Sequence, residues 1–247
     1  MEAILYICHG SRLPEAAEEA TSFIKSFIKK DNTIIQEYGF LELATPSIED
    51  AFRKCVERGA TLIKVIPILL LTAVHAKKDI PEKLLQLQGK YPTVEVRYGR
   101  PIGVHPYMVD ILSEHLYNNC SNLNPQSMVI IVGRGSSDPD VKRDLKIIAE
   151  MLRKRLNLKR VSDCYLTGVG PSFEQVLYSA KESEIKEIYI IPYLLFTGVL
   201  MNGMKKTIRC LFANSDKNPV LCHYLGYHPS IELILRERVI ELEQRGK

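Results

Sequence analysis

Three features are absent from this chain of 247 residues, and each absence excludes a class of protein. Its six cysteines are scattered and never occur as Cys-x-x-Cys, which argues against a structural zinc site or an iron–sulfur cluster. Its longest apolar run, residues 65–74, is interrupted by Pro67 and Thr72 and is too short to span a membrane. Its net charge of +4 includes no basic run of the kind that binds nucleic acid. We therefore expect neither a membrane nor a nucleic acid as a partner.

Nucleotide-binding motifs are missing as well. Residues 133–138, GRGSSD, begin like a dinucleotide fingerprint but have Asp138 where the third glycine belongs. Residues 168–173 end in Phe173 and fail in the same way, and a Walker motif is absent. These absences argue against a dinucleotide cofactor and against the use of ATP. The first residues, MEAILYICHGS, lack the basic region and cleavage pattern of a signal peptide, which predicts a cytoplasmic protein.

What the chain does contain is an internal repeat. Three pairs of segments correspond at a constant offset of 125 positions: GFLELATPSIE at 39–49 with CYLTGVGPSFE at 164–174, IPILLLTAVH at 66–75 with IPYLLFTGVL at 191–200, and HGS at 9–11 with RGS at 134–136. Two halves of about equal length therefore share one design, which predicts one lobe at residues 1–123 and a second at residues 124–247.

The repeat is unequal at three chemically important positions. His9, Glu42 and His75 of the first half correspond to Arg134, Thr167 and Leu200 of the second half. At these three positions, only the first half therefore has side chains that bind a transition metal strongly or accept a proton. This asymmetry predicts a single active site on a duplicated scaffold.

Each half alternates short apolar runs with segments of helical spacing. The runs are rich in Val, Ile, Leu and Tyr and alternate little, as is typical of parallel strands covered by helices on both faces. The expected strands are residues 4–8, 33–40, 62–71, 94–98, 128–132, 161–166, 187–196 and 220–225. The expected helices include residues 14–30, 47–59 (after a Thr45-Pro46 start signal), 139–156 and 171–182, and the polar residues 117–126 are the expected link between halves. The alternation predicts a three-layer α/β architecture.

His9, Glu42 and His75 each follow one of the expected strands. Because the carboxyl ends of parallel strands meet at one edge of a sheet, we expect the three side chains to lie at a shared edge. Two imidazoles and a carboxylate can bind a borderline divalent metal or accept protons. Each residue alone also has a simpler interpretation, as a hydrogen-bonding loop histidine, a solvated acid and a helix cap respectively. Cys8, beside His9, is interpreted as the inward residue of a strand end.

The second half offers groups that suit an anion rather than a metal. Arg134, Ser136 and Ser137 lie at an expected helix start, where backbone N–H groups favour a carboxylate, although the segment can equally be only a tight turn. His105 and His228 precede proline in both halves, which predicts a role in a repeated turn or helix start. His115 and His223 are interpreted as structural.

These motifs resemble those of the sirohydrochlorin chelatase family of the long, two-domain type, and within it the ferrochelatases of siroheme synthesis. The segments that carry the resemblance are CHGSR at 8–12, FLEL-TPSIE at 40–49, PILLLTAVHAKKDIP at 67–81, YGRPIG at 98–103, GRGSSDPDVKRD at 133–144 and PYLLFTGVLMN at 192–202. They extend over nearly the whole chain.

The resemblance implies a class II chelatase fold with two similar lobes, each built on a four-stranded parallel sheet. It implies that the chain inserts a divalent metal into the tetrapyrrole sirohydrochlorin without ATP, with His9, His75 and Glu42 as the catalytic and metal-binding residues. From their placement we expect Ser11, Arg134, Ser136, Ser137, Thr197 and Gly198 to bind the substrate. The metal, Fe²⁺ or Co²⁺, is then a substrate and not a permanent cofactor. Some cobalt-inserting relatives carry a metal-binding tail. The residues from Gln244 onwards contain no histidine or cysteine, which favours iron over cobalt as the inserted metal.

Other functions stay open on the sequence alone. The chain can be a cobaltochelatase of cobalamin synthesis, since Fe²⁺ and Co²⁺ both suit His/Glu ligation. It can also be a non-catalytic carrier of metal or tetrapyrrole. A phospho-histidine hydrolase is disfavoured because Cys8 stands where the Arg-His-Gly motif of that class needs arginine. An internally duplicated chain need not dimerise, so we expect a monomer.

Overall fold

The computed structural model describes residues 1–28, 34–120, 123–226 and 228–244. The chain forms two compact units: unit 1 comprises Met1–Gly103 and Ile231–Lys247, and unit 2 comprises Val104–Ser230. Each unit has a four-stranded sheet in which all strand pairs are parallel. The predicted α/β class with two four-stranded parallel sheets is therefore confirmed.

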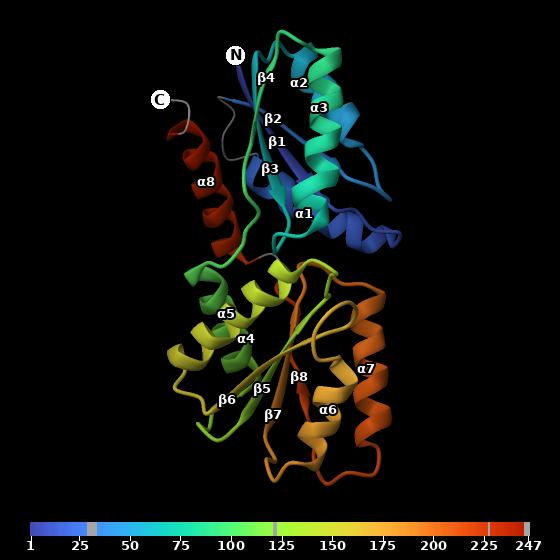
Figure 1. Cartoon of the computed structure of the whole chain (residues 1–247), viewed down its shortest axis with the longest axis vertical. Coiled ribbons are helices and arrows are strands. Elements are labelled where there is room, and N and C mark those ends of the chain that lie inside the picture. The colour runs from blue at the N-terminus through green and yellow to red at the C-terminus, as the bar shows by residue number, and fades with distance from the viewer. Residues whose placement is uncertain (29–33, 121–122, 227, 245–247) are drawn as a thin grey trace. The chain divides into compact units, whose positions relative to one another are not determined.

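Unit 1 has the strand order β2-β1-β3-β4. Its strands are β1 (Glu2–Cys8), β2 (Ile35–Phe40), β3 (Leu62–Ile68) and β4 (Glu95–Tyr98). Its helices are α1 (Pro14–Ile28), α2 (Ile48–Glu57), α3 (Ile80–Lys90) and α8 (Pro229–Gln244), and one π-helical turn, η1 (His75–Asp79), leads into α3. Apolar residues of α2 and α3 form one core with Leu5 and Val65 of the sheet. Tyr6, which points to the opposite face of β1, packs edge-on against Phe27 of α1. The sheet is thus covered on both faces (Figure 1).

Unit 2 repeats this architecture with the strand order β6-β5-β7-β8. Its strands are β5 (Met128–Gly133), β6 (Arg160–Tyr165), β7 (Ile188–Tyr193) and β8 (Val220–Leu221). Its helices are α4 (Pro106–Asn119), α5 (Pro139–Arg155), α6 (Phe173–Glu182) and α7 (Val199–Phe212). Helices α6 and α7 share one core with the sheet, and α4 and α5 contact each other as well as β7 and β6.

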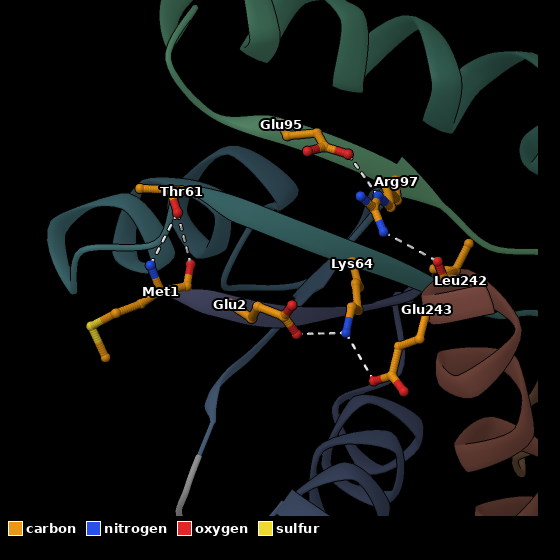
Figure 2. A network of polar contacts seen from close by, with 8 residues as sticks. All are labelled: Met1, Glu2, Thr61, Lys64, Glu95, Arg97, Leu242 and Glu243. Carbon is orange, nitrogen blue, oxygen red and sulfur yellow. Dashed lines mark hydrogen bonds and ion pairs between the residues drawn. The ribbon is translucent and has the colours of Figure 1, made fainter. Parts of the chain in front are cut away.

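The last helix of each half does not belong to the unit that its own half builds. Helix α4 ends the first half but belongs to unit 2, and α8 ends the second half but belongs to unit 1. Figure 2 shows part of the attachment of α8, in which buried Lys64 of β3 lies 2.6 Å from a carboxylate oxygen of Glu2 and 2.9 Å from one of Glu243. Arg97 also donates to the carbonyl of Leu242. The lobes expected at residues 1–123 and 124–247 have the bounds of the sequence repeat. The compact units have different bounds, because α4 belongs to unit 2 and α8 to unit 1.

Several element ends differ from the sequence-based expectation. The strands expected to reach residues 71 and 196 end at Ile68 and Tyr193. The reason is that the carbonyls just beyond them accept hydrogen bonds from loop residues instead of strand residues: Leu69 from Ile102, and Leu194 from Leu225. Helix α2 is capped by Ser47, which forms a capping box with Asp50, and not at the Thr45-Pro46 pair. Residues 29, 30 and 33 of two expected elements, 121 and 122 of the expected link, and the tail at 245–247 lie outside the described residues.

Candidate functional site

His9 is held by the loop that follows β1. Strand register places Cys8 beside Phe40 of β2 and Ile68 of β3, so the loops after these strands start at one edge. The amide of Glu42 donates to the carbonyl of His9 over 3.1 Å. Gly10 has a φ of +97°, and a Cβ atom there would lie 1.8 Å from the carbonyl oxygen of Glu42. Only glycine therefore allows the His9 loop to approach the Glu42 loop so closely.

His75 is held by η1. It is the first residue of this π-helical turn, and the amide of Ile80 donates to its carbonyl. The Nδ1 atom of His75 lies 2.6 Å from Oδ2 of Asp79, four residues later. Short π-helical segments of this kind occur often at functional sites. Asp79 was missed by the sequence analysis, although the His-x-x-x-Asp spacing in HAKKD places both side chains on one side of a helical turn.

The structure brings His9, Glu42 and His75 together. The Nε2 atoms of the two histidines lie 3.1 Å apart, and Nε2 of His9 lies 3.6 Å from Oε1 of Glu42. One ligand atom from each of the three residues lies within 4.8 Å of the other two. Within the described part of the chain, this is the one cluster of three or more potential metal ligands. The side chains of His9, His75 and Glu42 are 22%, 36% and 48% exposed, so solvent reaches the cluster.

The hydrogen bonds of the two imidazoles determine which nitrogen faces the cluster. The Nδ1 atom of His9 lies 3.1 Å from the carbonyl oxygen of Gly10, and Nδ1 of His75 contacts the Asp79 carboxylate. Carbonyl and carboxylate oxygens only accept, so we assign a proton to each Nδ1 and a lone pair to each neutral Nε2. Two lone pairs 3.1 Å apart repel each other unless a cation lies between them.

This spacing suits a shared metal ion. With metal–nitrogen distances of about 2.0–2.1 Å and bond angles of about 90–110°, two nitrogen ligands of one metal lie about 2.8–3.4 Å apart. The observed 3.1 Å falls in that range. The imidazole pair can therefore hold either one proton or one divalent metal, and the Glu42 carboxylate beside it offsets the positive charge.

Cys8 does not add a ligand to this cluster. It is 1% exposed, and burial raises the pKa of its thiol to about 12. A neutral buried thiol is a poor metal ligand and a poor nucleophile, because both roles need the thiolate. The interpretation of Cys8 as the inward residue of a strand end is thus confirmed.

The substrate-binding residues expected from the sequence fall into both units. Ser11 lies in the His9 loop, where its hydroxyl accepts a hydrogen bond from the amide of Leu13. The other five belong to unit 2: Arg134, Ser136 and Ser137 follow β5, and Thr197 and Gly198 precede α7. The hydroxyl of Ser136 accepts from the amide of Asp138 as part of the turn that begins α5. The role of these six residues in substrate binding stays a prediction.

Unit 2 reproduces the backbone of the site without its ligands. The amide of Thr167 donates to the carbonyl of Arg134, as that of Glu42 does to His9. Gly135 has a φ of +91°, and a Cβ atom there would lie 1.7 Å from the carbonyl oxygen of Thr167, which matches the arrangement at Gly10. The counterpart of Asp79, by the offset of 125, is the buried Met204. Within the described residues, the candidate metal-ligand cluster thus occurs in unit 1 and not at the corresponding loops of unit 2.

The remaining histidines have structural contacts. His105 and His228 each accept a hydrogen bond at Nδ1 from the amide two residues later, Tyr107 and Ser230 respectively. The predicted role at a repeated helix start is thus confirmed. His115 and His223 stack with ring centroids 6.2 Å apart, and burial together with the nearby His223 lowers the pKa of His115.

No helix in the described part of the chain is both long and apolar enough to cross a membrane. This finding agrees with the interrupted apolar run at residues 65–74.

Known proteins resemble this chain in sequence and in fold. The sequence profile of the CbiX family matches residues 3–119 and 128–242. A sirohydrochlorin ferrochelatase of Priestia megaterium is 47% identical over 239 residues, which cover 97% of this chain and 90% of the relative. A sirohydrochlorin cobaltochelatase of the same species is 35% identical over 246 residues, or 98% of this chain and 80% of the relative. The solved structure of SirB from Bacillus subtilis with Fe³⁺ is 39% identical and has a TM-score of 0.91 over 100% of this chain and 98% of SirB. Since the profile matches both halves and these relatives align along almost the full length, the chain belongs to the CbiX family.

Proposed function

We propose that this chain inserts Fe²⁺ into sirohydrochlorin to give siroheme, without ATP. The observation that supports this function best is the pair of imidazole Nε2 atoms 3.1 Å apart beside the Glu42 carboxylate. The similarity to a sirohydrochlorin ferrochelatase over 97% of the chain supports the substrate and the metal.

The first task of such an enzyme is to deliver the metal with few water ligands. His9 and His75 bind the ion through Nε2, and Glu42 neutralises part of its charge. Asp79 orients the His75 ring from behind, as carboxylates commonly do for metal-bound histidines. The partial exposure of all three ligands leaves one side of the ion accessible to a macrocycle.

The second task is to remove two protons from the inner nitrogens of the ring. The ion carries two positive charges into the ring and two protons leave it, so charge is conserved. When the ion passes to the ring nitrogens, the two imidazole lone pairs are released and can share one of these protons. The Glu42 carboxylate, which is 48% exposed, takes the other and passes it to solvent.

Unit 2 supplies the anion-binding groups in this proposal. The Arg134 guanidinium and the hydroxyls of Ser136 and Ser137 bind the peripheral carboxylates of the macrocycle, as does the Thr197-Gly198 turn. Ser11 contributes from the His9 loop of unit 1. We further propose that the chain works as a monomer, which light scattering at working concentration tests directly.

The function is tested by an anaerobic absorbance time course of sirohydrochlorin with Fe²⁺. We expect many turnovers per chain, and we expect His9→Ala and His75→Ala each to lower kcat by at least about 100-fold while circular dichroism stays unchanged. Leu200→Ala, at the position of unit 2 that corresponds to His75, is the matched control and should leave the chemical step intact. If both histidine variants metallate the ring at the wild-type rate, the proposed site is wrong.

Two alternatives are separated by the same assay. A parallel series with Co²⁺ tests cobalt insertion, which the 35% identity to a cobaltochelatase makes the second candidate. The ligand set binds either ion, so the ratio of kcat/KM values decides between them. A carrier without catalytic activity would give at most one metallated ring per chain.

A further inference from the structure

Leu43, directly after the Glu42 ligand, has an unusual backbone conformation. Its φ of +61° lies in the left-handed region, which residues other than glycine, asparagine and aspartate rarely adopt. The other described residue of this kind, Asn157, follows the end of α5, where asparagine is common. The counterpart of Leu43 in unit 2, at the offset of 125, is Gly168 with a φ of +81°. The duplicated loop thus needs this conformation, and unit 1 places a leucine where unit 2 has the residue that suits it.

Core packing does not explain the leucine. Its side chain is 47% exposed, although leucine is usually buried. Strain of this kind is typically retained at functional sites, where a side chain has to be presented in a given direction. In unit 2 glycine meets the conformational requirement, and there the backbone also lies so close to Ser136 that a Cβ atom at Gly168 would be 2.4 Å from the carbonyl oxygen of Ser136.

The backbone around Leu43 lies against the loop that carries His9. A Cβ atom added to Gly10 would lie 1.8 Å from the carbonyl oxygen of Glu42 and 3.6 Å from the amide nitrogen of Ala44, so the residues on either side of Leu43 abut the His9 loop. Val74, directly before the His75 ligand, is also an exposed aliphatic residue at 41%. Two of the three ligands therefore have an exposed aliphatic neighbour.

We propose that Leu43 packs against the apolar face of the tetrapyrrole and sets its height above His9, Glu42 and His75. This inference depends on the proposed function, because the metal reaches the ring nitrogens only if one ring face comes down onto the three ligands. An exposed aliphatic side chain on the loop next to them gains free energy when that flat, apolar face covers it. Leu43 carries no donor or acceptor for the metal, so its contribution is to substrate binding and not to metal affinity.

The test uses Leu43→Gly in the full chain. Glycine adopts a φ of +61° without strain, so we expect the melting temperature to stay the same or rise. We expect KM for sirohydrochlorin to rise by about 3- to 30-fold, because the variant loses the free energy of burying part of a leucine side chain against the ring. The Kd of Co²⁺ alone, measured by calorimetry, should not change. Leu43→Met, which restores an aliphatic side chain, should return KM towards the wild-type value.

A matched pair of variants gives the control. Leu43→Ala should raise KM, whereas Leu85→Ala, which removes a 70% exposed leucine from α3, should not. A wild-type KM in Leu43→Gly would overturn the inference while leaving the proposed function intact, since the wild-type chain still turns over. A weaker Kd for Co²⁺ in Leu43→Gly would also contradict it, because the effect would then pass through Glu42. Failure of the wild-type chain to metallate sirohydrochlorin would instead contradict the proposed function.

Discussion

The hydrogen bond from His75 Nδ1 to Asp79 is the contact that decides how His75 can act. Because the carboxylate only accepts, the proton stays on Nδ1 and the lone pair of Nε2 faces His9. The Gly10 carbonyl has the same effect on the His9 ring, but as a backbone group it cannot be removed by substitution. Asp79 is therefore the position at which the tautomer of the pair can be tested.

We expect Asp79→Asn to lower both Co²⁺ affinity and kcat by about 10- to 100-fold. The amide can donate to Nδ1, which moves the ring proton to Nε2 and removes the lone pair that binds the metal. The side chains of His75 and Asp79 are 36% and 35% exposed, so the melting temperature should change little. Calorimetry and the absorbance assay measure the two effects, and Asp79→Glu should restore part of each. Wild-type Co²⁺ affinity in Asp79→Asn would show that this hydrogen bond does not set the tautomer.

At the scale of elements, the attachment of α8 determines whether unit 1 is complete. Arg238 of α8 is 1% exposed and donates to the carbonyls of Pro101 and Ile102, while Arg100 pairs with Glu241. The buried Lys64 bridges β1 to the same helix through Glu2 and Glu243 (Figure 2). Burial alone would lower the pKa of Lys64, but its hydrogen bonds to Glu2 and Glu243 outweigh that effect and raise it. The hydrogen bond from Lys64 lowers the pKa of Glu2.

These pKa directions predict how Lys64→Met changes the acid sensitivity of the fold. Glu2 has a lowered pKa in the folded chain, so its stabilising contribution is present above the carboxyl pKa of the unfolded chain, about 4.3, and is lost as pH falls through the folded value. The variant lacks the ammonium group that causes this shift. In urea unfolding between about pH 6 and pH 3, the free energy of unfolding should fall more steeply for the wild type than for Lys64→Met. Parallel pH profiles would show that the ion pair contributes nothing at this position, whatever the absolute stability of the variant.

At the scale of the whole molecule, one backbone design occurs twice but carries the three candidate metal ligands once. Unit 2 repeats three backbone features of unit 1. They are the glycine that lies against a carbonyl (Gly10 and Gly135), the hydrogen bond between the first two loops, and the strand order. Arg134, Thr167 and Leu200 stand where unit 1 has its three ligands. At these three positions the units differ in their side chains, while the hydrogen bond between the first two loops is the same in both.

The triple variant Arg134→His, Thr167→Glu and Leu200→His should therefore gain a second metal site in unit 2. We expect calorimetry with Co²⁺ to give two sites per chain instead of one, the second weaker because Met204 stands in the place of Asp79. Adding Met204→Asp should strengthen the second site, provided that this buried position tolerates a carboxylate. A variant with Leu200→Ala in place of Leu200→His is the control and should keep one site. One site in the folded triple variant would show that the loops of unit 2 do not bring the three introduced side chains close enough to share a metal.

Pattern and spacing in the sequence were enough to predict the α/β class, the duplication and the three candidate ligands. Apolar runs such as residues 128–132 report burial on both faces, and the offset of 125 identified His9, Glu42 and His75 as positions where the halves differ. Parallel strands then bring their carboxyl ends to one edge whatever the details of the loops, which is why these distant residues could be expected to converge.

The tertiary structure alone decided the features that depend on contacts between distant or irregular segments. No periodic pattern encodes three of these features: the exchange of α4 and α8 between units, the 3.1 Å distance between two imidazole nitrogens, and the left-handed conformation of Leu43. Periodicity reports which face of an element is buried, but it does not report which sheet covers that face or where an irregular loop turns. Those outcomes are set by side-chain packing and by hydrogen bonds such as those of Arg238 and Asp79, whose partners are known only once the chain is folded.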